Sequence, residues 1–168
     1  NDFNAQQLET EYFEVSWHAT ARPTHQVWQG RVYTRQQLVD VCGLGTGPGL
    51  CGWNCYHSYW PFIPGVSKRQ YTDEELDRMN AKENKPKKYK GKEYTTYEAT
   101  QRQRYLETKI RALRKQIKLL KEGGASEDDL IAARSKYRAT MAEYADFSKN
   151  MGLPQERERI YMDGLGRV

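Results

Sequence analysis

The sequence contains no uninterrupted apolar run that approaches the roughly 18 residues of a membrane-spanning helix. Its first residues, Asn-Asp-Phe-Asn, have neither the basic nor the apolar segment of a secretory signal peptide. The mean hydropathy is correspondingly low, at -0.96. These absences predict a soluble chain without a membrane partner.

Apolar residues are also scarce, at 38% of the 168 positions, and they are unevenly placed. Aromatic residues concentrate in the first half of the chain, whereas Lys, Arg and Glu dominate the second half, so a sizeable core can form only in the first. The sequence therefore predicts an α+β protein with a small sheet domain (residues 1–81), a basic linker (82–94), a long antiparallel αα-hairpin (95–151) and a C-terminal tail (152–168).

The first domain shows short, well-delimited patterns. Alternating apolar side chains predict a strand over residues 11–17, and the apolar pairs on either side of residues 29–30 predict a β-hairpin or a bulged strand. Thr34 and Thr72 are good N-caps and predict short helices that begin at the next residue. The aromatic segment 56–65 contains two prolines, which favour a strand at a sheet edge. The expected sheet is small, and mixed or antiparallel.

The second half shows the heptad spacing of packed helices. Apolar residues separated by four, three, four and three positions mark one face of a helix from about Thr95 to Glu122: Leu106, Ile110, Leu113, Ile117 and Leu120. Gly123-Gly124 ends this helix, and Ser126 caps a second one with an apolar residue at every seventh position: Leu130, Tyr137, Tyr144 and Met151. Because each helix has a single apolar stripe, we expect the hairpin to pack on the first domain or to mediate oligomerisation.

The three cysteines are an odd number, which argues against a secreted disulfide framework and favours reduced thiols or metal ligands. With one histidine they form the pattern C-x8-C-x3-C-x-H: Cys42, Cys51, Cys55 and His57. Three thiolates and one imidazole suit a tetrahedral zinc ion, so zinc is the candidate cofactor. The pattern lacks the C-x2-C knuckle of common zinc modules, which leaves buried hydrophobic thiols or a redox-active thiol as alternatives.

Five glycines and one proline crowd the stretch 43–52. Each glycine costs backbone entropy on ordering, so we expect a bound ion, a ligand or a partner chain to fix this loop. The stretch matches neither the phosphate-binding G-x-x-x-x-G-K-[ST] pattern nor a dinucleotide fingerprint, because no lysine follows and the flanking elements are absent. Nucleotide sites of these two types are therefore excluded.

A second group of reactive residues consists of Arg22, His25 and His57. Two histidines and an arginine can cleave a phosphodiester: one imidazole accepts a proton from a ribose hydroxyl, the other protonates the leaving oxygen, and the guanidinium stabilises the charge. An RNase-like effector or toxin domain is thus the alternative to a non-enzymatic protein. Histidines among aromatic strands are more commonly hydrogen-bonded parts of a core, so we favour the non-enzymatic interpretation.

The net charge of +5 is concentrated in one region, since 14 of the 27 basic residues lie between Lys82 and Lys121. A basic stripe of this kind indicates a polyanion such as DNA as partner, and a solvated helix face is the alternative. The residues that we assign to nucleic-acid binding are Lys85, Lys87, Lys88, Lys90, Lys92, Arg111, Arg114, Lys115 and Lys118.

Several stretches carry a family resemblance: RPTHQVWQGRVY (22–33), CGLGTGPGLCGWNCYHS (42–58), PFIPG (61–65) and YEATQRQRYLETKIR (97–111). In this order they resemble the minor capsid proteins of tailed bacteriophages, a branch related to the Mu-type head-morphogenesis proteins. Tyr56 departs from the pattern, because a basic residue is expected between the cysteine and the histidine. A role of this position in phosphate binding is therefore doubtful.

The resemblance implies a structural component of the virion that acts in head morphogenesis. Its expected partners are the phage portal or other capsid proteins, and packaged DNA in the capsid interior. Its expected location is the virion, and the cytoplasm of the host bacterium during assembly.

Overall fold

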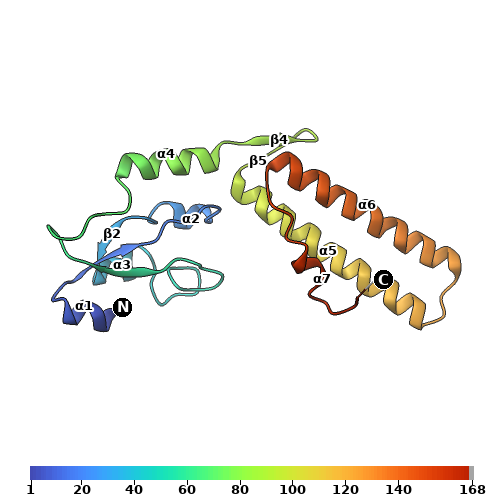
Figure 1. The fold of residues 1–168 in the computed structure, drawn as a ribbon, viewed down its shortest axis with the longest axis horizontal. Coiled ribbons are helices and arrows are strands. Elements are labelled where there is room, and N and C mark those ends of the chain that lie inside the picture. The colour runs from blue at the N-terminus through green and yellow to red at the C-terminus, as the bar shows by residue number, and fades with distance from the viewer. Residues whose placement is uncertain (167–168) are drawn as a thin grey trace. The chain divides into compact units, whose positions relative to one another are not determined.

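The computed structural model describes residues 1–166, and it divides the chain into two compact units with the boundary between Lys85 and Pro86 (Figure 1). The first unit holds a three-stranded sheet with short helices, and the second holds two long helices with a small β-hairpin. The fold is α+β, as the sequence predicts. Among the described residues, no helix combines the length and the apolar character needed to cross a bilayer.

The sheet of the first unit is antiparallel and has the strand order β2-β1-β3. Its central strand is β1 (Tyr12–Val15), flanked by β2 (Val32–Thr34) and β3 (Tyr59–Phe62), so that Phe13 faces Tyr33 on one side and Pro61 on the other. The aromatic segment with its proline forms an edge strand, as expected. The residues just before β3 therefore lie beside those just after β1, and the amide of Ser16 donates to the carbonyl of Ser58.

The hairpin expected around residues 29–30 is wrong. Instead, Pro23 opens the short helix α2 (Pro23–Gln26), because Arg22 has the extended backbone that a residue before proline prefers and proline suits the first helical position. Gly30 has a φ of +73° and turns the chain into β2, which then pairs with β1. As a result, His25, Gln26, Trp28 and Gln29 are buried in the first unit without forming a strand, whereas Val27 is exposed.

Three further helices surround the sheet: α1 (Asp2–Gln7), α3 (Arg35–Asp40) and α4 (Asp73–Asn84). Both α3 and α4 begin with a complete capping box at the threonine that the sequence indicates. The core of this unit consists of Ala5, Phe13, Val15, Trp28, Leu38, Cys42 and Leu50.

The glycine loop, residues 43–54, forms no helix or strand and is held by its own backbone. The amide of Leu50 donates to the carbonyl of Cys42 at 2.8 Å, and the amide of Trp53 donates to the carbonyl of Gly47 at 2.6 Å. A Cβ atom at Gly52 would lie 2.3 Å from that same carbonyl oxygen. Gly49 and Gly52 are therefore needed because backbone segments of the loop pack against one another directly.

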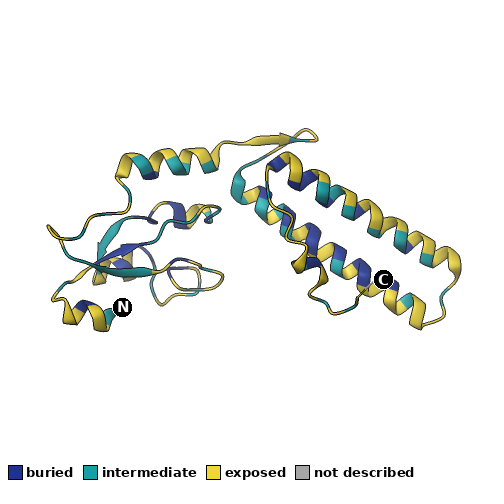
Figure 2. Cartoon of the chain, viewed as in Figure 1, coloured by how far each residue is buried: buried dark blue, intermediate teal, exposed yellow. Residues whose placement is uncertain are grey.

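The second unit is built on α5 (Thr96–Glu122) and α6 (Glu127–Met151), which run side by side in opposite directions (Figure 1). Figure 2 shows buried residues along one stripe of each helix. The predicted heptad positions lie on these stripes: Leu106, Ile110, Leu113, Ile117, Tyr144 and Met151 are buried. The αα-hairpin is thus formed by the pattern that predicts it.

The stretch predicted as a linker, 82–94, contains the end of α4 and a β-hairpin, made of β4 (Lys87–Tyr89) and β5 (Lys92–Tyr94). The two tyrosine rings of this hairpin lie 5.1 and 5.3 Å from the ring of Phe147 on α6. Edge-to-face aromatic contacts of this kind add to the area that the rings bury. The β-hairpin therefore belongs to the second unit.

The chain after α6 returns to α5 through α7 (Glu158–Tyr161) and the following loop. Ile160 is fully buried against the helix pair. The side chain of Arg114 is only 2% exposed and forms a bidentate pair with Asp163, at 2.8 and 3.1 Å. The same guanidinium donates to the carbonyl of Gly166 at 2.6 Å and lies 4.8 Å from the ring centroid of Tyr161. A buried arginine that donates three hydrogen bonds thus holds this segment in place.

Candidate metal centre and basic surface

Two histidines and one cysteine of the first unit converge, although 30 positions separate the first histidine from the cysteine. His25 lies on α2, and Cys55 and His57 lie on the segment between the glycine loop and β3. The Sγ of Cys55 is 3.8 Å from the Nδ1 of His25 and 3.5 Å from the Nδ1 of His57. These three atoms all lie within 4.8 Å of one another, and we call them the His-Cys-His cluster.

Hydrogen bonds on the far side of each ring fix the position of its proton. The Nε2 of His25 is 2.8 Å from the carbonyl oxygen of Pro48, which can only accept. The Nε2 of His57 is 2.9 Å from the Oε1 of Gln29, and this oxygen also accepts from the backbone N–H of His18 at 3.0 Å, which fixes the orientation of the amide. Both rings therefore carry their hydrogen on Nε2 and turn an unprotonated Nδ1 toward the thiol.

The side-chain amide of Gln29 is held in turn by a hydrogen bond to Asn80 on α4. Its Nε2 donates to the Oδ1 of Asn80 at 3.1 Å, and the same oxygen accepts from the indole N–H of Trp17 at 3.1 Å. Asn80 also donates to the backbone carbonyl of Gln26 at 3.2 Å. Since Gln29 is only 1% exposed, this network holds the orientation of His57 inside the unit.

Both imidazoles of the cluster are almost excluded from solvent. His25 is 2% exposed and His57 is 6% exposed. Burial is the largest of the effects that lower the pKa of His57 to about 4, and the nearby His18 and His25 act in the same direction. Burial also lowers the pKa of His25, against the opposing effect of its hydrogen bond to the Pro48 carbonyl. Both rings are therefore neutral near pH 7, which is the form that binds a metal ion.

The other two cysteines of the predicted pattern lie outside this cluster. Cys42 is buried in the core of the first unit, where burial raises its pKa to about 12. Cys51 is exposed, and its Sγ donates to the backbone carbonyl of His57 at 3.6 Å. Of the predicted zinc ligands, the fold brings together Cys55 and His57, and it adds His25 to them.

The residues assigned to phosphodiester cleavage lie in the same region. The rings of His25 and His57 are 5.3 Å apart, and the positive charge of Arg22 lowers the pKa of both. However, the guanidinium of Arg22 donates to the backbone carbonyl of Trp53 at 2.6 Å, and both imidazoles are buried. A phosphate that is to be cleaved must reach the imidazole nitrogens, and here both rings are buried. The arrangement therefore favours binding of a metal ion by the cluster over cleavage of RNA.

Sequence reasoning did not connect His25 with the thiols, and it did not identify the groups that orient the rings. Pro48, Gln29 and Asn80 lie in a loop, a turn and a helix that become neighbours only in the folded unit. Glutamine and asparagine are common surface residues, so nothing in the one-dimensional pattern marks Gln29 as buried or Asn80 as its partner.

The basic residues assigned to nucleic acid fall into two groups. Exposed side chains lie on the end of the first unit, on the β4–β5 hairpin and on α5: Lys85, Lys87, Lys88, Lys90, Lys92, Lys115 and Lys118. Arg111 is half-buried and donates to the carbonyl of Arg159 at 2.6 Å. Arg114 is buried and paired with Asp163, so it is not available to a phosphate in this structure.

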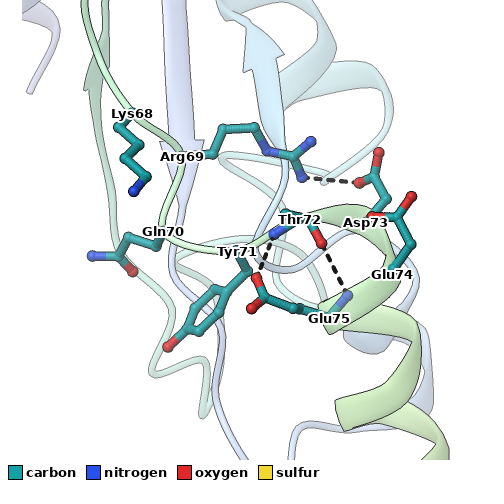
Figure 3. Close-up of a pocket in the computed structure, with 8 residues that line it drawn as sticks. All are labelled: Lys68, Arg69, Gln70, Tyr71, Thr72, Asp73, Glu74 and Glu75. Carbon is teal, nitrogen blue, oxygen red and sulfur yellow. Dashed lines mark hydrogen bonds and ion pairs between the residues drawn. The ribbon is translucent and has the colours of Figure 1, made fainter.

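A surface pocket of the first unit is lined by residues 68–75, at the start of α4 (Figure 3). Arg69 donates to Asp73 at 2.9 Å, and Thr72 and Glu75 exchange the two hydrogen bonds of the capping box. The hydrogen bonds of Arg69, Asp73, Thr72 and Glu75 are thus used to complete the N-terminus of α4. We therefore do not assign a ligand site to this pocket.

Comparisons with known proteins give one relationship of broad coverage. A family model described as phage minor capsid protein 2 matches residues 2–149, which span most of both units. No curated protein and no solved structure matches the chain.

Proposed function

Because the chain belongs to the phage minor capsid protein 2 family, we propose that it acts in head morphogenesis, in association with the portal or the capsid interior. Family membership itself supports a structural role in the phage particle and contact with other capsid components. The finer assignment is supported by the architecture, in which a compact sheet unit is joined to a long, charged helical unit. Assembly in the cytoplasm of the host bacterium is part of this proposal.

A second part of the proposal is that the helical unit contacts packaged DNA. The charges of the two units differ in sign: residues 1–85 carry 8 Lys and Arg against 10 Asp and Glu, whereas residues 86–168 carry 19 against 12. The net charge of the second unit is therefore +7. A field of this sign attracts phosphate without regard to base sequence.

Within the second unit the positive charge is not evenly distributed. The β4–β5 hairpin has four lysines and one glutamate, and α5 has eight basic residues against three acidic ones. In contrast, α6 has four basic residues against five acidic ones. We therefore assign DNA contact to the exposed lysines of the hairpin and of α5: Lys88, Lys90, Lys92, Lys115 and Lys118.

Protein partners are supported by exposed apolar side chains on the same helices. Tyr105 and Leu119 on α5, and Ile131 on α6, are each more than half exposed. Where such side chains form a contiguous patch, they commonly mark contacts with other proteins. They are candidates for contact with portal or capsid subunits, or with a second copy of this chain.

The DNA assignment is tested by measuring the affinity of the chain for duplexes of unrelated sequence over a range of salt concentrations. We expect a linear fall of log K with log salt and no sequence preference. Replacing Lys88, Lys90 and Lys92 with alanine removes three contacts, so the slope should decrease by up to about 2.7, at about 0.9 per phosphate.

The matched control replaces Arg134, Lys136 and Arg138 on α6 with alanine, which removes the same net charge elsewhere. This triple variant should retain most of the wild-type slope. An equal loss in both triple variants would mean that only net charge matters, and an absence of binding at low salt would remove DNA from the proposed partners.

A further inference from the structure

We propose that the His-Cys-His cluster is a zinc site whose protein ligands are the Nδ1 of His25, the Sγ of Cys55 and the Nδ1 of His57. The proposal is independent of the role of the chain in the phage particle. It replaces two thiols of the sequence pattern, Cys42 and Cys51, with one imidazole from α2. The fourth position of a tetrahedral ion is then left to a water molecule.

The distances suit such an ion. Ligands that lie 2.0–2.3 Å from zinc at the tetrahedral angle are about 3.3–3.7 Å from one another. The sulfur of Cys55 is 3.5 Å from one Nδ1 and 3.8 Å from the other. The two sulfur–nitrogen distances are thus close to those of a bound ion, and the two Nδ1 atoms, which lie within 4.8 Å of each other, approach to about 3.3 Å when they share it.

The hydrogen-bond count within the cluster also favours a cation at this position. Both Nδ1 atoms are acceptors, since each ring carries its hydrogen on Nε2. The thiol of Cys55 has a single hydrogen, which satisfies one of the two acceptors and leaves the other without a donor from the thiol. Buried acceptors without partners are costly. A zinc ion bound by the deprotonated thiol satisfies all three atoms together.

The surroundings of the rings are those of metal-binding histidines. In such sites the ring nitrogen that does not bind the metal commonly donates to a carbonyl or carboxylate oxygen, which fixes the tautomer and the ring orientation. Here Pro48 and Gln29 provide these oxygens, at 2.8 and 2.9 Å. The glycine loop contributes Pro48, so the same loop geometry that packs the backbone also positions His25.

The first test measures zinc bound by the full chain, purified without chelator and then dialysed against zinc, by elemental analysis. We expect about one equivalent per chain. Cobalt titration of the metal-free protein should give tetrahedral absorption bands with the charge-transfer intensity of one Co–S bond. Three Co–S bonds, or less than about one tenth of an equivalent of zinc, would overturn the proposal.

Variants assign the ligands. His25→Ala and Cys55→Ser should each weaken zinc binding by more than about a hundredfold, beyond the range for orienting partners, whereas Cys51→Ser should leave it unchanged and serves as the matched thiol control. Gln29→Ala removes an orienting group, and we expect a smaller loss of about tenfold or more, in the range for such partners. Loss of binding in Cys51→Ser with retention in His25→Ala would contradict the assignment.

A measurement on the unaltered chain remains decisive if a variant does not fold. Zinc should slow the alkylation of Cys55 by iodoacetamide and leave that of the exposed Cys51 unchanged, as read from peptide masses. Equal rates for Cys55 with and without zinc would contradict a Zn–S bond at this residue.

Discussion

Replacing Gly52 with alanine tests the conclusion that backbone packing orders the glycine loop. The φ of Gly52 lies outside the left-handed region, so alanine is not disfavoured there by conformation. Its Cβ would instead lie 2.3 Å from the carbonyl oxygen of Gly47 and 2.4 Å from that of Thr46. Ordinary contacts of a Cβ atom begin near 3.4 Å, and both neighbours are backbone atoms, so the loop must move.

The expected cost has two parts. Overpacking of a well-packed site costs about 1–3 kcal/mol. The displaced carbonyl of Gly47 also accepts from the amide of Trp53 at 2.6 Å, and loss of that hydrogen bond costs about 1 kcal/mol more. We therefore expect a loss of about 3 kcal/mol from the free energy of unfolding of the first unit. For a unit of this size, that corresponds to a decrease in Tm of about 12–24 °C.

Tryptophan fluorescence is the appropriate assay, because all four tryptophans lie within residues 1–85 and report on the first unit alone. The protein is unfolded thermally in the presence of chelator, so that bound metal does not contribute to the measured stability. In a parallel measurement, zinc affinity should also decrease, since Gly52 lies in the loop that carries the Pro48 carbonyl.

Gly45→Ala is the matched control within the same loop. Gly45 has a φ of +87° and no atom within 4 Å of the position of a Cβ, so its replacement tests conformation without a clash. We expect a loss of about 1 kcal/mol from the left-handed backbone. A Gly52→Ala variant as stable as Gly45→Ala, or as the wild type, would refute the packing argument.

Two further predictions concern buried groups elsewhere in the chain. Arg114→Ala leaves the carboxylate of Asp163 without its bidentate partner, and it should destabilise the second unit by about 3–5 kcal/mol. Circular dichroism of the long helices measures this loss. The control is Lys118→Ala, which breaks an exposed ion pair with Glu122 and is expected to cost less than about 1 kcal/mol. In the native protein at pH 8, iodoacetamide should modify Cys51 but not Cys42, because burial raises the pKa of the Cys42 thiol to about 12. Peptide mass spectrometry distinguishes the two, and modification of Cys42 before unfolding would contradict its burial.

Local signals predicted the helices well, for a physical reason. The threonines at positions 34, 72 and 95 and Ser126 each accept a hydrogen bond from the backbone amide three residues later, so a cap is defined within four residues of sequence. The heptad spacing likewise depends only on helix geometry. By contrast, the expected strand around residues 27–28 is wrong, since Pro23 starts a helix and Gly30, which has a positive φ and packs against Leu76, turns the chain into β2.

The sequence also grouped two of the three residues of the His-Cys-His cluster, Cys55 and His57, because they are neighbours in one short motif. It could not separate them from Cys42, since thiols that bind metal and thiols that fill a core are identical in sequence. The structure distinguishes them by environment: Cys42 lies among Leu38 and Leu50, and Cys55 faces two imidazoles.

By itself the sequence determined the α+β class, the helical hairpin, the basic character of the second half and the resemblance to phage minor capsid proteins, which the family model confirms. Each of these depends on composition or on spacing over a few turns. Only the tertiary structure decided that His25 joins Cys55 and His57, and that Arg114 is buried rather than facing solvent. Both depend on contacts between residues 30 or more positions apart, and such contacts are formed by packing of whole elements, which a local pattern does not encode.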